Sequence, residues 1–160
     1  MKNIAVIGYG GQGAWHCSQI LASDVCNLTG TYDIRQVRND AAKANGIFVY
    51  DSNEAIFADT TVDIVVIAVP NDSHEYLVIN ALQAGKHVIC EKPMVQTEVQ
   101  IQELFTYAKS HNLFLMEAEK TMFTPLNQKI KTMIDEGIIG KLHTIKAQYC
   151  CDILEDVDAN

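Results

Sequence analysis

The feature that most constrains this chain is a glycine cluster directly after a short apolar run. Residues 4–7 are Ile-Ala-Val-Ile, which is typical of a strand buried on both faces of a parallel sheet, and residues 8–13 are Gly-Tyr-Gly-Gly-Gln-Gly. In this G-x-G-x-x-G spacing Gly8 permits a tight turn, Gly10 lets the main chain approach a pyrophosphate, and Gly13 allows close helix–strand packing. The residues expected to bind a dinucleotide here are Gly8, Gly10, Gly11, Gln12 and Gly13.

A second feature independently supports dinucleotide binding. Residues 28–32 form another apolar run, and it is followed by Asp33, which stands 20 residues after Gly13. An acid at this separation accepts hydrogen bonds from an adenosine ribose and repels a 2′-phosphate, so NAD is the favoured cofactor. Arg35 and Arg38 leave NADP open, because either could pair with a 2′-phosphate or lie over the adenine instead of being solvated.

The remaining chain alternates short apolar runs with segments of helical spacing. Further strands are expected over residues 64–68, 87–90 and 114–116, and helices over about 11–22 and after Thr97. This alternation predicts an α/β fold, a Rossmann-type doubly wound parallel sheet with helices on both faces. Ligands should then bind at the carboxyl ends of the strands.

Two helices carry clear start signals. Thr97 and Gln100 form a capping box before an apolar face of Ile101, Leu104, Phe105 and Ala108. Thr124 and Pro125 predict a cap and a first helical position for a second helix that ends at Gly137. The apolar stripe of that second helix is expected to consist of Leu126, Ile130, Met133 and Ile134.

The pattern changes near the end of the chain. Residues 142–149 alternate apolar and polar side chains, which predicts a strand with one solvated face. We therefore expect a dinucleotide-binding domain over residues 1–122. Residues 123–160 should hold a helix and the first strand of a truncated second α/β domain, and the exposed apolar side of that strand should promote self-association.

Composition excludes several functional classes. The 160 residues include 12 basic and 20 acidic side chains, and the net charge of −8 disfavours nucleic-acid binding. Five cysteines without C-x-x-C spacing indicate reduced thiols rather than a disulfide framework or a zinc site, so no metal is expected. No long apolar segment or cleavage signal is present, which predicts a cytoplasmic protein without a membrane partner.

Two further motifs carry a family resemblance. Residues 68–74 fit A-V-P-N-x-x-H and residues 85–93 fit G-K-H-V-x-x-E-K-P. In this order after the glycine cluster, they resemble the glucose-fructose oxidoreductase and inositol dehydrogenase family, Gfo/Idh/MocA. Residues 116–118, 123–125 and 134–140 are most similar to the branch that contains dihydrodiol dehydrogenases. The resemblance covers residues 1 to about 150.

The resemblance implies roles for the residues after two of the strands. Lys92 would lie beside the nicotinamide and accept or relay the substrate hydroxyl proton, although a lone lysine here could also be a solvated loop residue. Glu91 would orient or pair with Lys92, and Pro93 would follow a cis peptide bond. His74 would line the cofactor cleft or, alternatively, cap the following helix. The cofactor-binding residues implied in this region are Ala68, Pro70, Asn71, His74, Glu91, Lys92 and Pro93.

The expected function is that of an NAD(P)-dependent oxidoreductase, or of its nucleotide-binding part. It would transfer hydride between a nicotinamide and a hydroxyl of a sugar, polyol or cyclic diol. The family resemblance implies a second domain that supplies a catalytic aspartate and histidine and the homo-oligomer surface, so we expect this chain alone to be inactive. A non-catalytic dinucleotide sensor or scaffold is one alternative, and a semialdehyde dehydrogenase of another Rossmann family is a second.

Overall fold

A computed structural model describes residues 1–148 of the chain. Two compact units are present, Met1–Glu119 and Lys120–Asn160. The expected domain boundary after residue 122 lies close to this division and stays a prediction.

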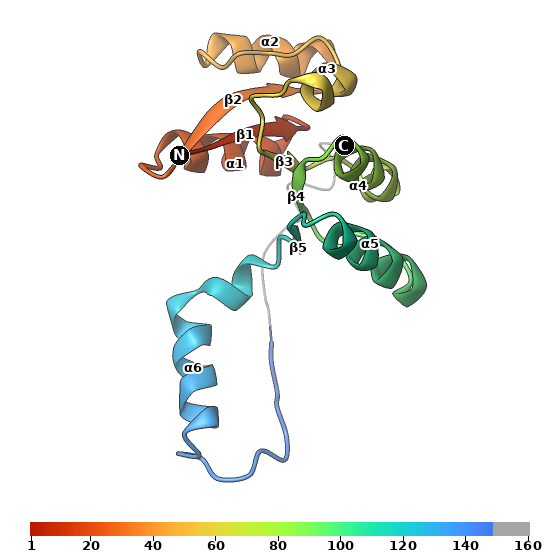
Figure 1. Cartoon of the computed structure of the whole chain (residues 1–160). Coiled ribbons are helices and arrows are strands. Elements are labelled where there is room, and N and C mark those ends of the chain that lie inside the picture. Colours follow the sequence, from red (N-terminus) through yellow and green to blue (C-terminus); the bar gives the residue numbers. More distant parts are fainter. Residues whose placement is uncertain (149–160) are drawn as a thin grey trace. The chain divides into compact units, whose positions relative to one another are not determined.

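The first unit is built on a parallel sheet of five strands in the order β2-β1-β3-β4-β5 (Figure 1). The strands are β1 Lys2–Ile7, β2 Cys26–Tyr32, β3 Ile64–Ile67, β4 His87–Cys90 and β5 Leu115–Glu117. All five predicted runs are strands, with ends that differ from the predicted ends by two residues at most. The predicted Rossmann-type doubly wound sheet is confirmed.

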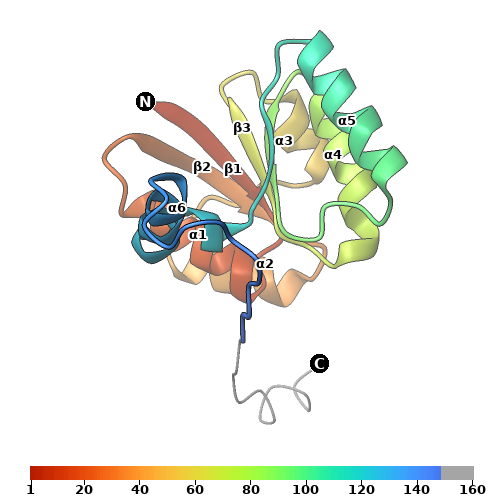
Figure 2. The same cartoon turned by 90° about the horizontal axis from the view of Figure 1, so that it is seen from below.

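Helices cover both faces of this sheet. They are α1 Gly11–Leu21, α2 Gln36–Ala44, α3 Asn53–Ala58, α4 His74–Gln83 and α5 Glu98–Ser110. The pleat of β1 shows the two layers directly, because Ile4 and Val6 pack with α1 and α2 whereas Ala5 and Ile7 pack with α3, α4 and α5. Figure 2 shows these two groups of helices on either side of the strands. Among residues 1–148, none of the helices is long and apolar enough to cross a membrane.

The capping box predicted for the helix after Thr97 is present. The Thr97 hydroxyl accepts a hydrogen bond from the Gln100 main chain, and the Gln100 side chain accepts one from the Thr97 main chain. Leu104 and Ala108 are buried as expected. The prediction for Phe105 was wrong, because this ring is 45% exposed. The core thus covers only part of the apolar face of α5.

The second unit contains a short 3₁₀ helix, η2 Lys120–Phe123, and α6 Pro125–Asp135. Thr124 caps α6 and Pro125 occupies its first turn, as predicted. The strand predicted over residues 142–149 is not formed at residues 142–148, and Tyr149 lies outside the described part. A strand needs a hydrogen-bonded neighbour, and within residues 1–148 the region 142–148 pairs with no other segment.

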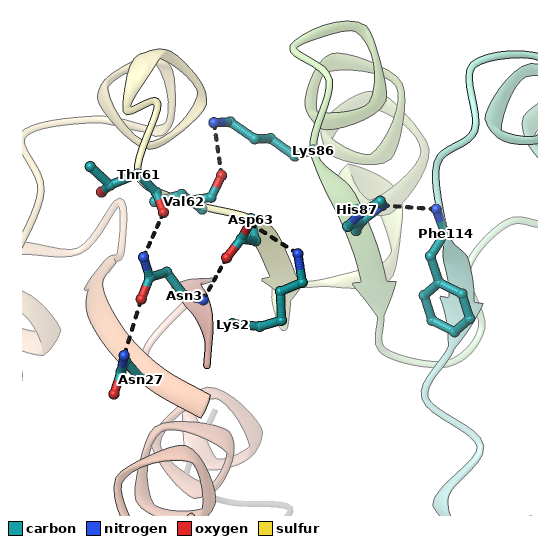
Figure 3. Close-up of polar contacts among 9 residues, drawn as sticks. All are labelled: Lys2, Asn3, Asn27, Thr61, Val62, Asp63, Lys86, His87 and Phe114. Atoms are coloured by element: carbon teal, nitrogen blue, oxygen red, sulfur yellow. Dashed lines mark hydrogen bonds and ion pairs between the residues drawn. The ribbon is translucent and has the colours of Figure 1, made fainter. Parts of the chain in front are cut away.

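Polar side chains close the amino edge of the sheet, opposite the site described below (Figure 3). Asp63 accepts a hydrogen bond from the main-chain N–H of Asn3 at 2.8 Å and forms an ion pair with Lys2 at 3.3 Å. The Asn3 N–H is the main cause of a lowered pKa at Asp63. Lys86, only 6% exposed, donates to the carbonyl oxygens of Asp59 at 2.6 Å and Val62 at 3.0 Å. Lys86 thus satisfies two main-chain acceptors just before β3.

These bonds predict a structural role for the lysine of the G-K-H-V motif. Lys86→Met should lower the free energy of unfolding by about 1–3 kcal/mol, because two carbonyl oxygens lose a buried donor. Urea denaturation followed by circular dichroism measures this change. Lys43→Met, which removes an exposed lysine in the last turn of α2, should change stability by less than about 0.5 kcal/mol. Equal losses in the two variants would contradict the prediction.

Candidate functional site

The register of the sheet brings the residues after four strands into one row at its carboxyl edge. Ile7 pairs with Tyr32 on one side and with Ile67 on the other, and Ile67 pairs with Cys90. Main-chain bonds continue this ladder one residue further, from the N–H groups of Gly8, Ala68 and Glu91 at 2.7, 2.8 and 2.9 Å. The row at the edge therefore consists of Asp33, Gly8, Ala68 and Glu91.

A bulge between β1 and β2 sets part of this row. Ile4 pairs with Leu28 but Ala5 pairs with Gly30, so Thr29 is an extra residue in β2. The shift places Asp33, rather than Tyr32, beside Gly8 at the end of the strands. A one-residue slip would turn the carboxylate toward the opposite face of the sheet.

The strand order places the crevice between β1 and β3. From β1 the chain crosses to β2 on one side, and from β3 it crosses to β4 on the other. The loops after β1 and β3 therefore leave in opposite directions, and open α/β sheets of this topology bind ligands in the crevice at the carboxyl ends of these strands. The glycine cluster follows β1 and the segment 68–74 follows β3, so both predicted motifs border this crevice.

Two glycines of the cluster are required by close main-chain contacts. Gly8 has a φ of +92°, and a Cβ there would clash with the carbonyl group of Ala68. A Cβ on Gly13 would clash with the carbonyl of Gly8, because α1 packs tightly on the end of β1. Gly10 differs, since a Cβ there would meet only the mobile end of Arg38, and at Gly11 it would meet nothing within 4 Å. Packing thus accounts for Gly8 and Gly13 but not for Gly10.

The amino end of α1 offers donors to an anion. Gly10 is its extended N-cap residue and makes no side-chain cap, and the helix begins with Gly11 and Gln12. The first N–H groups of a helix have no intrahelical acceptor, and the helix dipole favours negative charge there. Together with the absent Cβ at Gly10, these groups form a cradle that suits a pyrophosphate.

Asp33 is a buried acid that fixes the glycine loop. One carboxylate oxygen accepts the N–H of Tyr9 at 2.8 Å and the other accepts the N–H of Arg35 at 2.9 Å. Asn39 holds the Asp33 main chain through bonds of 2.9 and 2.8 Å. A carboxylate oxygen has two lone pairs, so each can still accept from a ribose hydroxyl.

Arg35 lies near the Asp33 carboxylate, and Arg38 lies beside Gly10. Arg35 is mostly exposed and its Nε is 3.8 Å from a carboxylate oxygen of Asp33. The Arg38 guanidinium lies beside Gly10, against the position that a Cβ of that residue would occupy. In a chain with a net charge of −8, both arginines place positive charge beside the crevice.

Two acidic side chains, Glu91 and Glu117, anchor the turn after β4. Glu91 pairs with His16 of α1 at 2.8 Å, and both side chains are largely buried. Lys92 and Pro93 are exposed at the tip and are joined by a cis peptide bond, as the resemblance implied for Pro93. Glu117 of β5 accepts the N–H of Met94 at 2.9 Å. Lys92 therefore projects from an anchored turn at the carboxyl edge.

His74 lies beneath the site rather than on its surface. The side chain is fully buried, with Nδ1 2.7 Å from the Pro93 carbonyl oxygen and Nε2 2.9 Å from that of Val69. His74 begins α4, but its side chain makes no cap. Its neighbours Pro70 and Asn71 are exposed at the crevice. The imidazole therefore contacts main-chain carbonyl groups next to the cleft and does not itself line the cleft.

The thiols near the site are protonated and buried. Burial, followed by the charges of Glu117 and Glu91, raises the pKa of Cys90 to about 12. Burial raises the pKa of Cys17 in α1 to about 11. Neither thiol is a nucleophile near neutral pH.

Sequence reasoning missed several residues that organise the site. They are His16, Asn39 and Glu117. One signal existed for His16, because it lies three residues after Gly13 and beside Cys17 on the face of α1 that packs on the sheet. Asn39 lies six residues after its partner Asp33, at the start of the next helix, and its role was overlooked although the contact is local. Glu117 has no local signal, since its partner Met94 is 23 residues away.

Comparison with known proteins agrees with this geometry. Residues 2–119 match a family described as the oxidoreductase family with an NAD-binding Rossmann fold, GFO_IDH_MocA. Trans-1,2-dihydrobenzene-1,2-diol dehydrogenase of Xenopus tropicalis is 31% identical over 121 residues, which are 76% of this chain and 37% of that enzyme. D-Xylose 1-dehydrogenase (NADP(+)) of Hypocrea jecorina is 44% identical over 91 residues, or 57% of this chain and 23% of that enzyme.

A solved structure shows the same fold. The crystal structure of an NAD-binding protein from Listeria innocua superposes with a TM-score of 0.80 and 38% sequence identity, over 88% of this chain and 42% of that one. The chain thus spans well under half the length of the relatives that it matches.

Proposed function

The chain belongs to the Gfo/Idh/MocA oxidoreductase family, whose members bind NAD(P) through a Rossmann fold, and from this premise we propose its site and reaction. Residues 1–119 form the nucleotide-binding part of a dehydrogenase. The reaction transfers hydride between the nicotinamide and a hydroxyl-bearing carbon of a sugar, polyol or cyclic diol. The cradle at Gly10, which packing does not explain, is the observation that carries the proposal.

The residues at the carboxyl edge suit successive parts of this cofactor along the crevice. The N-terminal amides of α1 would hold the pyrophosphate at Gly10, Gly11 and Gln12, and Asp33 would accept the adenosine ribose hydroxyls. The nicotinamide end would then lie along Pro70 and Asn71 and the turn after β4. The residues on that side are Ala68, Pro70, Asn71, Glu91, Lys92 and Pro93.

Lys92 is the group proposed to move the proton. When bound, the cofactor supplies the carbon that accepts hydride from the substrate. Lys92 Nζ, exposed at the tip of an anchored turn, would take the hydroxyl proton as the carbonyl forms, either directly or by relay. Glu91 is engaged by His16 and so fixes the turn rather than neutralising the lysine.

The relatives support a substrate with adjacent hydroxyl groups. One is named for a dihydrodiol and the other for D-xylose, and both are dehydrogenases. The sensor alternative finds no support among them. The substrate wall and any oligomer surface would belong to the greater part of the relatives' length, which this chain does not span.

We further propose that NAD is preferred to NADP. The Asp33 carboxylate is only 6% exposed and is fixed by two main-chain donors, so it cannot swing away from a 2′-phosphate. Placing a 2′-phosphate beside this carboxylate would cost roughly several kcal/mol in repulsion between like charges. Arg35 and Arg38 are the residues that would overturn this preference.

A matched pair of glycine variants tests the cradle. Gly10→Val should weaken NADH binding by at least about tenfold, because its side chain would occupy the pyrophosphate position. Gly11→Val is the comparison, because it keeps the main-chain N–H that would bind the pyrophosphate and its Cβ meets no other atom of the chain within 4 Å, so it should change affinity much less. Calorimetric titration with NADH measures both, and circular dichroism checks that the fold persists. Unchanged affinity in Gly10→Val would refute the proposed pyrophosphate site.

Asp33→Ser tests the cofactor preference. The wild-type chain should bind NADH at least about tenfold more tightly than NADPH, and the variant should bring the two affinities close together by removing the repulsive charge. Serine retains an oxygen that can accept from the Tyr9 N–H. Asp40→Ser on α2 removes an equal charge from an exposed position and should leave the ratio unchanged. Tighter binding of NADPH by the wild-type chain would show that the arginines dominate.

Lys92→Met tests the proton transfer. In a protein that joins this unit to the substrate-binding part of a relative, the variant should bind NADH within a few-fold of wild type. Single-turnover hydride transfer should fall by roughly 10²–10⁴ because the positioned base is lost. Near-normal hydride transfer would remove Lys92 from the mechanism.

A further inference from the structure

We propose that His74 is a positioning residue that sets the nicotinamide end of the cleft by joining the turn after β3 to the turn after β4. The inference rests on the proposed function. It concerns a side chain that is fully buried and therefore acts through the main chain of other residues.

The imidazole bridges two main-chain acceptors from different strands. Nδ1 lies 2.7 Å from the carbonyl oxygen of Pro93, and Nε2 lies 2.9 Å from that of Val69. Carbonyl oxygens only accept hydrogen bonds, so a neutral ring donates to one of them and a doubly protonated ring to both. In either state the buried ring lies between the two turns and contacts the main chain of both.

Both bridged residues adjoin proposed site residues. Val69 immediately precedes Pro70 and Asn71, and Pro93 immediately follows Lys92. The main-chain ladder between β3 and β4 ends at the bond from the Glu91 N–H to the Ile67 carbonyl. Beyond that point the two turns diverge from regular pairing, and the His74 side chain connects them. Loss of this connection should displace the nicotinamide side of the crevice and leave the pyrophosphate side in place.

The fold offers a matched control at the opposite edge of the same strands. Lys86 also is buried and also lies near two carbonyl oxygens, those of Asp59 and Val62 before β3. His74 and Lys86 therefore make equivalent numbers of buried contacts with main-chain oxygens, one at the site and one away from it. A variant at each position separates a loss of stability from a loss of positioning.

The experiment compares two probes that differ in the nicotinamide. ADP-ribose retains the adenosine and the pyrophosphate, whereas NADH adds the nicotinamide, so the ratio of their affinities reports on the nicotinamide end alone. Wild type, His74→Leu, His74→Gln and Lys86→Met are titrated with each probe by calorimetry, and urea denaturation gives their stabilities. The 160-residue chain itself is used throughout.

The wild-type chain should bind NADH more tightly than ADP-ribose. In His74→Leu the ADP-ribose affinity should stay within about twofold and the NADH affinity should fall by roughly fivefold to tenfold. His74→Gln keeps an amide donor for one carbonyl and should lie between wild type and His74→Leu. Lys86→Met should lose stability and keep the wild-type affinity ratio.

Three outcomes would overturn the inference. An unchanged ratio in both His74 variants would show that the ring only stabilises the fold, and an equal change in Lys86→Met would show a general effect of destabilisation. Equal wild-type affinities for the two probes would remove the nicotinamide from this part of the cleft. If His74→Leu does not fold, the ratio in His74→Gln decides. By contrast, a wild-type chain that binds neither probe would refute the proposed function itself.

Discussion

The site depends on the register of a parallel ladder. Neighbouring strands β2, β1, β3 and β4 end within the same row, so the first residue after each strand meets the others at one edge. The bulge at Thr29 is part of this constraint, because it brings Asp33 level with Gly8. Side chains alternate between faces along a strand, so a shift of one residue in any pair would disassemble the row. The two-sided core fixes the register of the central strands, since β1 and β3 bury apolar residues on both faces.

Buried polar side chains extend this order beyond the ends of the strands. At the carboxyl edge, the pair of His16 and Glu91 links the glycine-loop helix to the turn after β4, and His74 links that turn to the one after β3. At the amino edge, Lys86 donates hydrogen bonds to main-chain carbonyl groups in the segment just before β3. Main-chain groups at sheet edges lack ladder partners, and buried ones must be satisfied by other donors and acceptors. These side chains meet that requirement and, at one edge, also shape the crevice.

The second unit shows how far a local pattern can predict structure. Its helix α6 begins as expected because the Thr124 cap and Pro125 act within one turn of the chain. The alternating segment over residues 142–148 forms no strand, because alternation describes a face and a strand also requires a neighbour. The prediction for Phe105 failed for a related reason. Helical spacing marks the apolar side of a helix, but the extent of the layer that covers the helix decides which rings are buried.

By itself the sequence determined the five strands, the glycine loop with Asp33, and the capping box at Thr97, together with the family to which they belong. Each is encoded within a few residues or at a fixed spacing, where chain geometry alone relates the pattern to the structure. Only the tertiary structure decided that His16 would meet Glu91, 75 residues away, and that His74 would turn inward. Such contacts depend on which strands become neighbours and on the space left between them, and no local periodicity carries that information.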